Sequence, residues 1–359
     1  TPTYPYGNVF KGYKNKLYYR DYYNGINIYR ILAVTGYRNS LFKKLLRYLS
    51  FMVIGTIYSV FLRKKYDYIF GFNIGSLTSM LPALVVSKIK KIPLTLWVQD
   101  LWPDSVYSYG VKKNKLLEFL LDRFVKVVYG SANSIAITSK GFENKIKLLI
   151  GEDINLHYLP NWPDDIDLSL ESYKFNIHRK VNFTFAGNIG KFQNLENIII
   201  AFSDLPKKYI NKAQLNIIGD GSNLEKLKSI NTCKNIIFYG KKPRKDMGKY
   251  YKGSDFLIVS LIDEPIFANT VPAKTQTYIS ACKPILAIIH GETAELIRKN
   301  NLGYCAKPND LKEITKVFMK SIDSDEYILS KFRNNSRNLL NNEFNKEKNI
   351  NLLESILSS

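Results

Sequence analysis

VNFTFAGNIGKFQNLENIIIAFS, residues 181–203, is the stretch that decides the fold. Its first part, Val181–Gly187, is rich in aromatic and β-branched residues and predicts a strand, and its last part, Leu195–Ser203, predicts a helix. A strand that leads through a glycine loop into a helix is the repeating unit of a doubly wound domain. Gly190 permits close backbone approach, the helix N-terminus favours an anion, and Lys191 adds positive charge. The loop is therefore a candidate phosphate site, although turns of this kind are common.

The same alternation of strands and helices continues in both directions along the chain. The strands expected are Asn27–Val34, Tyr66–Phe72, Leu94–Asp100, Ser134–Ser139 and Leu156–Pro160, then Val181–Gly187, Gln214–Gly219, Asn235–Gly240, Phe256–Ser260, Pro284–Ile289 and Tyr304–Ala306. The helices expected between them are Leu77–Ile89, Lys113–Tyr129, Lys140–Leu149, Leu195–Ser203, Leu224–Ile230 and Glu292–Asn300. Near-continuous apolar strands with intervening helices predict parallel sheets covered on both faces. The fold class is therefore α/β, with two doubly wound, Rossmann-like domains.

The 359 residues are enough for two such domains. Their boundary is expected at Pro160-Asn161-Trp162-Pro163-Asp164-Asp165, which favours neither helix nor strand and is followed by a polar run to Lys180. We expect a first domain over residues 1–160, a linker over 161–180, a second domain over 181–324, and charged helices over 325–359. The sequence opens at Thr1 without the strand, loop and helix that usually begin a doubly wound domain, and Asn27–Val34 is its first clear strand. We expect the gene to encode such a unit before Thr1, and the chain without it to be less stable.

Composition and charge limit the function classes. The chain has 52 basic and 31 acidic residues, a net charge of +21, which predicts anionic partners. Three cysteines without CxxC spacing argue against a disulfide scaffold and a zinc ribbon and fit a reducing cytosol. Three widely spaced histidines give no metal-binding pattern, and we expect no metal site.

One window of the chain is basic and free of acids. No Asp or Glu lies between Asp21 and Asp67, and the window holds Arg30, Arg38, Lys43, Lys44, Arg47, Arg63, Lys64 and Lys65. Inside it, Leu41–Leu62 carries apolar residues at helical spacing, but its uninterrupted apolar part is shorter than the ~20 residues that span a bilayer. This pattern predicts a helix that is half core and half contact with an anionic membrane surface. The alternative is a core helix with solvated charged ends.

Polar and aromatic residues follow the strand Leu94–Asp100. The segment WVQDLWPDS, residues 97–105, places Gln99, Asp100 and Trp102 at the carboxyl end of a parallel strand, where ligands bind in open α/β sheets. Carboxylates beside aromatic faces suit a sugar. The alternative is a helix-capping Asp104 beside tryptophans that only pack.

Three later loops are expected at one edge of the second sheet. They carry Gly219, then Gly240 and Lys241, and then the long segment DEPIFANTVPAKTQTY, residues 263–278. In that segment a helix is expected to start near Pro272, with Asn269 or Thr270 as the cap. Lys274 then lies in the first turn, where the helix dipole disfavours a cation, so an anion between it and the amides is the best explanation. The alternative is an exposed lysine that pairs with Glu264 or extends into solvent.

Six motifs in this order resemble retaining glycosyltransferases of the GT-B fold: WVQDLWPDS, YLPNW, FAGNIGKFQNLE, IIGDG, FYGKKPRKDMGKYY and SLIDEPIFANTVPAKTQTYISACKPILA. The nearest resemblance is to bacterial O-antigen and capsule transferases of the N-acetyl-L-fucosamine transferase type. It implies two Rossmann-like domains that face a cleft, a nucleotide-sugar donor on the second domain and an acceptor on the first. It also implies an interdomain hinge at Pro160–Asp165, a last helix that crosses back to the first domain, and no metal.

The resemblance assigns roles to residues of this chain. Asn188 and Gln193 stand where the family usually has Arg and Lys, Asn269 and Thr277 stand where many relatives have two glutamates, and Gln99 stands in place of the usual His. Lys274, with Lys191, must then carry the phosphate charge. The donor-binding set is Asn188, Gly190, Lys191, Gln193, Gly219, Gly240, Lys241, Asp263, Glu264, Asn269, Thr270 and Thr277; Gln99 and Trp102 bind the acceptor, and Lys274 and Asp100 are catalytic.

The predicted function is retaining transfer of a sugar, N-acetyl-L-fucosamine in the nearest resemblance, from a UDP-linked donor. No cofactor is expected. The predicted acceptor is an undecaprenyl-diphosphate-linked saccharide at the cytoplasmic face of the bacterial inner membrane, in O-antigen or capsule synthesis. One alternative is a sugar-nucleotide 2-epimerase, which shares the two doubly wound domains. The other is a non-enzymatic basic protein that binds membranes or nucleic acid, although RNA-stacking motifs are absent and we expect no nucleic-acid partner.

Overall fold

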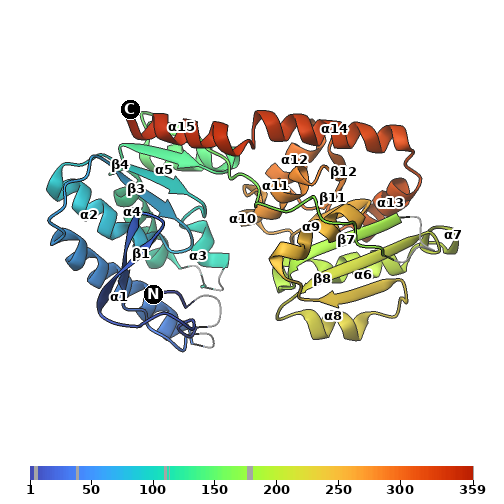
Figure 1. Cartoon of the computed structure of the whole chain (residues 1–359), viewed down its shortest axis with the longest axis horizontal. Helices are drawn as coiled ribbons and strands as arrows, with labels where there is room; N and C mark the ends of the chain where they lie inside the picture. The colour runs from blue at the N-terminus through green and yellow to red at the C-terminus, as the bar shows by residue number, and fades with distance from the viewer. Residues whose placement is uncertain (4–6, 38–39, 109–110, 113, 176–180, 359) are drawn as a thin grey trace. The chain divides into compact units, whose positions relative to one another are not determined.

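The computed structural model describes residues 1–3, 7–37, 40–108, 111–112, 114–175 and 181–358. The chain divides into two compact units (Figure 1). Unit 1 comprises Thr1–Thr138, Phe142–Leu159 and Glu354–Ser359, and unit 2 comprises Ser139–Gly141 and Pro160–Leu353.

Unit 2 is built on a sheet of six parallel strands. The strands are β7 (Val181–Asn188), β8 (Ala213–Asp220), β9 (Ile236–Gly240), β10 (Phe256–Ser260), β11 (Ile285–Ile288) and β12 (Gly303–Ala306), in the spatial order β12-β11-β10-β7-β8-β9. Strands β7, β8 and β9 follow one another in one direction across the sheet, whereas β10 lies on the other side of β7 and is followed there by β11 and β12. The point where the direction changes therefore lies between β7 and β10, and the loops that follow these strands flank it.

Helices cover both faces of this sheet (Figure 1). One face packs against α6 (Leu195–Ser203), α8 (Leu224–Ile230) and α13 (Leu311–Ile322). The other packs against α9 (Met247–Gly253), α11 (Ala273–Ser280), α12 (Glu292–Lys299) and α14 (Glu326–Asn342). Short α7 (Lys207–Ile210) and α10 (Pro265–Ala268) lie in connections, and α15 (Lys346–Ser358) ends the chain. The sequence analysis did not identify α7, α9, α10 or α13 as separate helices.

The segment expected to be a linker is packed onto unit 2 over much of its length. Tyr173 N–H donates to the Lys249 carbonyl at 2.9 Å, and Phe175 is buried in the core of unit 2. Gly248 is so close to the segment that a Cβ there would lie 1.9 Å from the Asp167 carbonyl oxygen. Backbone contacts and the buried Phe175 ring therefore hold residues 167–175 on unit 2, which composition did not reveal. Residues 176–180 of the predicted linker lie outside the described residues.

Unit 1 contains a sheet of four parallel strands in the order β3-β4-β5-β6. The strands are β3 (Ile69–Asn73), β4 (Leu94–Val98), β5 (Ser134–Ile137) and β6 (Leu156–Tyr158). They are connected through η1 (Leu77–Met80) with α2 (Leu81–Lys90), through α3 (Asp104–Ser108) with α4 (Lys115–Tyr129), and through η2 (Lys140–Phe142) with α5 (Glu143–Ile150). The core of this unit combines Leu94, Leu96 and Ile135 of the sheet with Val125 and Val128 of α4.

The expected strand Asn27–Val34 does not belong to this sheet. It overlaps β2 (Ile26–Ile31), which pairs antiparallel with β1 (Tyr18–Tyr23) in a separate hairpin. Asn24 and Gly25 form the turn with positive φ angles of 46° and 86°, the backbone typical of a two-residue hairpin loop. The prediction was wrong because it missed this Asn-Gly turn between two alternating runs.

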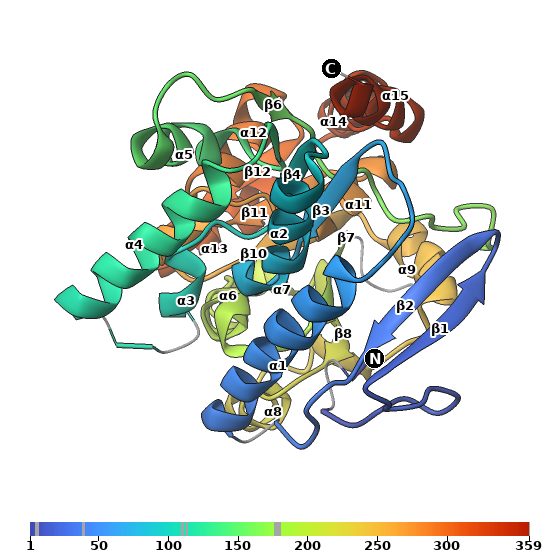
Figure 2. The ribbon, with the colours of Figure 1, turned by 90° about the vertical axis from the view of Figure 1, so that its left-hand side faces the viewer.

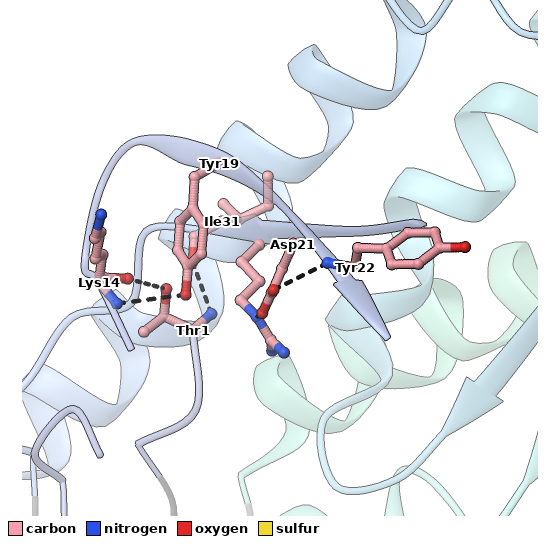
Figure 3. Close-up of polar contacts among 7 residues, drawn as sticks. Thr1, Lys14, Tyr19, Asp21, Tyr22 and Ile31 are labelled. Atoms are coloured by element: carbon pink, nitrogen blue, oxygen red, sulfur yellow. Dashed lines mark hydrogen bonds and ion pairs between the residues drawn. The ribbon is translucent and has the colours of Figure 1, made fainter. Parts of the chain in front are cut away.

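Figure 3 shows the polar contacts at this hairpin and the segment before it. The Arg30 guanidinium and Asp21 form an ion pair at 2.9 Å across the two strands. Tyr22 N–H donates to the same carboxylate at 2.9 Å, and Thr1 Oγ1 donates to the Lys14 carbonyl at 3.2 Å. The hairpin packs on α1, where the Tyr18 and Tyr58 rings lie 4.7 Å apart. The hairpin β1–β2 and helix α1 therefore pack together within unit 1 (Figure 2).

The basic apolar window forms the helix α1 (Leu41–Val60). Ser40 caps it by accepting a hydrogen bond from Lys43 N–H at 3.2 Å, and Gly55 faces Pro82 of α2. The opposite side keeps six large apolar residues exposed, with exposed fractions between 37% and 69%: Phe42, Leu45, Leu46, Leu49, Val53 and Ile57. No helix within the described residues is long and apolar enough to cross a bilayer. Arg38, one of the basic residues of the window, lies outside the described residues.

Candidate functional site

The loop after β7 is held by the loop after β8. Ile189 N–H donates to the Asp220 carbonyl at 2.8 Å, and Asn223 N–H donates to the Ile189 carbonyl at 3.0 Å. Gly219 has a φ of +148°, and a Cβ on it would lie 1.8 Å from the Gly187 carbonyl oxygen. Gly219, which the sequence placed in the donor site, is therefore required by backbone packing alone.

This packing shapes the loop that carries the predicted phosphate site. Asn188 and Lys191 are exposed, whereas Gly190 and Gln193 are partly buried. Gly190 precedes the 3₁₀ turn η3 (Lys191–Gln193), and α6 follows directly. Asn188 and Lys191 thus face solvent at the edge of the sheet, and Gln193 faces inward.

Lys274 occupies an enclosed position at the point where the chain direction of unit 2 changes. As predicted, it lies in the first turn of α11; the helix begins at Ala273, with Pro272 at the N-cap position. Its Nζ donates to Gln193 Oε1 at 2.7 Å and lies 4.1 Å from the centre of the Phe185 ring. A Cβ on Gly187 would lie 3.3 Å from the same nitrogen. We call this arrangement of Phe185, Gly187, Gln193 and Lys274 the lysine socket.

The socket provides no counter-charge for the ammonium. Lys274 forms no ion pair with a carboxylate of the described residues, so the alternative of an exposed lysine paired with Glu264 was wrong. Burial lowers the pKa of Lys274 to about 7, although the residue as a whole keeps partial exposure. An ammonium has three N–H donors, and Gln193 accepts from one. A buried cation of this kind favours an anion that supplies the missing charge and acceptors.

The remaining predicted donor-site residues in 263–270 lie outside the lysine socket. Asp263 and Glu264 are exposed, and the Asp263 carboxylate lies 3.3 Å from His290 Nδ1 and accepts from Asn309 Nδ2 at 3.4 Å. Asn269 and Thr270 do not cap α11. Asn269 is the C-cap of α10, and the Thr270 hydroxyl donates to the Ile266 carbonyl of α10 at 3.1 Å, so both residues belong to the end of α10, and Pro272 takes the N-cap position of α11.

Buried hydroxyls near the socket were not identified from the sequence, apart from Thr277. Thr275 and Thr277 are buried on α11, and Ser260 is buried at the end of β10. Within the described residues, the Ser260 and Thr275 hydroxyls have no hydrogen-bond partner.

In the loop after β9, Gly240 has a positive φ of 66° with open space where a Cβ would lie, and Lys241 is exposed. No group of three or more His, Cys, Asp or Glu suited to a metal ion occurs among the described residues.

In unit 1, two of the predicted residues bind the same glycine. Asp100 Oδ2 accepts from Gly75 N–H at 2.6 Å, and Trp102 Nε1 donates to the Gly75 carbonyl at 2.8 Å. Burial raises the pKa of Asp100, and the hydrogen bond from Gly75 acts in the opposite direction. Gln99 N–H donates to the Asn73 carbonyl at 3.0 Å. The fold already uses the indole N–H of Trp102, and the Trp102 ring packs edge-on against Phe124, with the ring centres 6.4 Å apart.

The alternative of packed tryptophans describes part of this segment. Trp97 is buried and its indole N–H donates to the Leu159 carbonyl at 2.9 Å. Asp104 lies in the first turn of α3 and forms an ion pair with Lys145. Sequence reasoning missed Gly75 and the buried Asn73 side chain, which has no hydrogen-bond partner among the described residues. Neither position carries a recognisable signal in one sequence.

Two Rossmann-like units, each with polar groups at the carboxyl edge of a parallel sheet, define the GT-B class of glycosyltransferase folds. Two solved structures share the fold: HepE of Anabaena in complex with UDP and glucose (TM-score 0.65, 14% identity, 86% of this chain and 81% of that chain) and sucrose-phosphate synthase of Thermosynechococcus elongatus (TM-score 0.67, 14% identity, 91% and 82%). These likenesses show the fold alone.

Sequence comparisons support the glycosyltransferase family. Residues 171–339 match the family model described as glycosyl transferases group 1. The chain is 27% identical over 243 residues to the probable glycosyltransferase WbjE of Pseudomonas aeruginosa, a match that covers 64% of this chain and 60% of that protein. It is 26% identical over 245 residues to an uncharacterized glycosyltransferase of Methanocaldococcus jannaschii, covering 66% and 61%. The chain therefore spans about 60% of the length of these relatives, and the findings support the group 1 glycosyltransferases with the GT-B fold.

Proposed function

We propose that this chain is a glycosyltransferase whose unit 2 binds a nucleotide-sugar donor through the lysine socket. The observation that carries the proposal is the buried ammonium of Lys274 beside Gln193, without a carboxylate partner among the described residues, at the edge of a parallel sheet. A diphosphate supplies the charge that this ammonium lacks. HepE, which shares the fold, was solved with UDP and glucose, and this supports a UDP-linked donor here.

The proposed chemistry is transfer with retention at the anomeric carbon. As the bond from sugar to diphosphate breaks, negative charge grows on the leaving phosphate and positive charge grows on the sugar. Lys274, the N-terminus of α11 and the amides near Gly190 stabilise the leaving charge, which is worth more in a site that excludes water. The leaving phosphate oxygen takes the proton of the incoming hydroxyl, so no side-chain base is needed. Asp100 and Gln99 orient hydroxyl groups of the acceptor.

The proposed acceptor is an undecaprenyl-diphosphate-linked saccharide at the inner face of the bacterial inner membrane. Support comes from α1, which combines an exposed apolar side with exposed Lys43 and Lys44 near its start and exposed Arg63, Lys64 and Lys65 after its end. A helix of this kind suits the surface of an anionic bilayer. The proposal that the sugar is N-acetyl-L-fucosamine, for O-antigen or capsule, rests only on the resemblance of the sequence motifs.

Titration calorimetry with UDP tests the socket. We expect wild-type protein to bind UDP and Lys274→Met to bind it about 10 to 150 times more weakly, since a hydrogen bond to a charged group contributes about 1.5–3 kcal/mol. The matched control is Lys316→Met, which removes an exposed lysine on α13 and should leave the affinity unchanged. Equal affinities of wild type and Lys274→Met contradict the assignment of the donor site.

A second assay separates transfer from the alternative activities. Radiolabelled UDP-sugars are incubated with the protein and bacterial membranes, and lipid and aqueous fractions are analysed separately. Label in the lipid fraction supports transfer, whereas a changed sugar in the aqueous fraction indicates an epimerase. UDP binding without either product indicates a binding protein and contradicts the proposed activity of this chain.

A further inference from the structure

The strands β7 and β10 separate toward their carboxyl ends, beside the lysine socket. Their pairing ends at Thr184 with Leu257. Each strand stays paired with its other neighbour for longer, β7 with β8 as far as Asn188 and β10 with β11 as far as Ser260. Ala186, two residues beyond Thr184, is buried and, among the described residues, has no strand partner on the β10 side. Its backbone N–H and C=O therefore need another partner.

The hydroxyl of Tyr278, on α11, takes the place of the missing strand. Ala186 N–H donates to Tyr278 Oη at 3.2 Å, and Oη donates to the Ala186 carbonyl at 3.2 Å. One hydroxyl can do both, because it has one donor and two acceptor lone pairs. Burial raises the pKa of this hydroxyl well above its usual value, so it keeps the proton that it donates. The fully buried ring packs edge-on against Tyr251, with the ring centres 5.6 Å apart, which fixes its place.

Tyr278 and Lys274 lie on the same side of α11, because residues four apart on a helix are neighbours. Their partners on β7 are neighbours too. Tyr278 binds Ala186, and Lys274 Nζ lies beside the next residue, Gly187, on which a Cβ would be 3.3 Å away. Helix α11 packs on the face of the sheet that includes Ala186, whereas the ammonium lies over Phe185 of the other face. The lysine side chain therefore crosses the carboxyl end of β7, where β10 has separated from it.

We propose that Tyr278 is a positioning residue for the donor site, whose hydroxyl holds α11 on β7 in place of β10 so that Lys274 reaches the bound diphosphate. The inference rests on the proposed donor site and extends it to a fully buried residue. Phenylalanine at this position would leave both backbone groups of Ala186 buried without a partner, and α11 and β10 would shift to satisfy them. Lys274 would then lose its place beside Gly187 and Gln193.

A double-mutant cycle with UDP tests the proposal on the full chain. We expect Tyr278→Phe to bind UDP about ten-fold more weakly than wild type. In the Lys274→Met background the same change should alter UDP affinity less than about two-fold, because the tyrosine acts through the lysine. Uridine, which has no phosphate, should bind to wild type and to Tyr278→Phe equally. A tyrosine with a purely structural role would instead lower UDP affinity by the same factor in both backgrounds.

The matched control is Tyr304→Phe on β12, an edge strand of the same sheet. It removes a hydroxyl that lies 2.8 Å from Ser324 Oγ, so it should lower the urea midpoint of unit 2 and leave UDP affinity unchanged. Circular dichroism and urea unfolding report whether each variant is folded.

A second substitution serves if Tyr278→Phe does not fold. The cycle is then run with 4-aminophenylalanine in place of Tyr278, because its amino group still donates to the Ala186 carbonyl but accepts poorly from the N–H. This variant should bind UDP about three-fold more weakly than wild type, and should cause no further loss in the Lys274→Met background.

The outcomes separate the two proposals. Lys274→Met that binds UDP as wild type does overturns the donor site, and the role of Tyr278 with it. Weak binding by Lys274→Met together with wild-type affinity of Tyr278→Phe leaves the donor site in place and overturns the positioning role. Equal losses of UDP affinity in both backgrounds, or an equal loss of uridine affinity, also overturn that role, because the tyrosine then acts on the whole unit.

Discussion

Replacement of Lys274 by methionine should stabilise the free protein and at the same time weaken the binding of UDP about 10-fold to 150-fold. Methionine keeps a long apolar side chain over the Phe185 ring and removes the ammonium that burial penalises. A lysine that served only the structure should show the opposite behaviour, because its loss would cost stability. The sign of the stability change therefore distinguishes the two roles.

The magnitude follows from the pKa of Lys274. Burial lowers this pKa from 10.5 to about 7. At about 1.4 kcal/mol per pKa unit, the 3.5-unit difference gives an upper limit of about 5 kcal/mol for the cost of the buried ammonium. Because Lys274 keeps partial exposure, we expect a gain of about 1–3 kcal/mol in the free energy of unfolding of Lys274→Met at pH 6.

The pH dependence has a defined sign. Between about pH 7 and pH 10.5 the unfolded chain binds more protons at this lysine than the folded chain. The free energy of unfolding of the wild type therefore rises with pH across that window, and the cost of burial is complete below it. The advantage of Lys274→Met should be largest at pH 6 and fall to less than half at pH 9, where the upper limit is about 2 kcal/mol.

Urea unfolding at both pH values, with UDP titration on the same samples, measures these effects. Lys316→Met serves as the control and should change the free energy of unfolding by less than about 0.5 kcal/mol. A Lys274→Met protein that is less stable than wild type at both pH values, yet binds UDP normally, would refute the reasoning.

Three further changes test the surroundings of the two candidate sites. Gln193→Glu should place a carboxylate beside Lys274, neutralise it within the protein, and lower UDP affinity at least about ten-fold in calorimetry; unchanged affinity contradicts the socket. Gly219→Ala should prevent folding of unit 2, because its Cβ would clash with a backbone carbonyl, whereas Gly240→Ala, with open space at positive φ, should cost only about 1–2 kcal/mol in urea unfolding. Trp102→Phe should lower the stability of unit 1 by about 1–3 kcal/mol, since it leaves the Gly75 carbonyl without its donor; wild-type stability contradicts that role.

Periodicity and turn residues predicted most elements of this protein. The bounds Phe256–Ser260, Leu195–Ser203 and Leu224–Ile230 match β10, α6 and α8 to the residue. These segments have one continuous pattern and clear boundaries, so local information is sufficient. Pro272 likewise placed Lys274 in the first turn of a helix, because proline is tolerated at a helix start.

Where local patterns were ambiguous, the predictions differ from the structure. The run Asn27–Val34 alternates like any half-buried strand, and only pairing with Tyr18–Tyr23 shows that it belongs to a hairpin outside the parallel sheet. The polar segment after Pro160 reads as a linker, but Phe175 is buried in the core of unit 2. Burial of such a segment depends on the surface opposite, which sequence pattern does not describe.

The fold class of this protein and the residue types in each loop follow from local sequence, since a strand or helix depends largely on neighbours along the chain. Which of these residues come into contact depends on how the elements pack. Gln193 and Lys274 are 81 residues apart, and their contact arises because the chain direction changes between β7 and β10. Gly75 is bound by Asp100 and Trp102 for the same reason, as the loops after neighbouring strands end at one edge. Within the part of the chain that the structure describes, no carboxylate pairs with Lys274, and this depends on the packed surroundings of the side chain and has no counterpart in the local sequence.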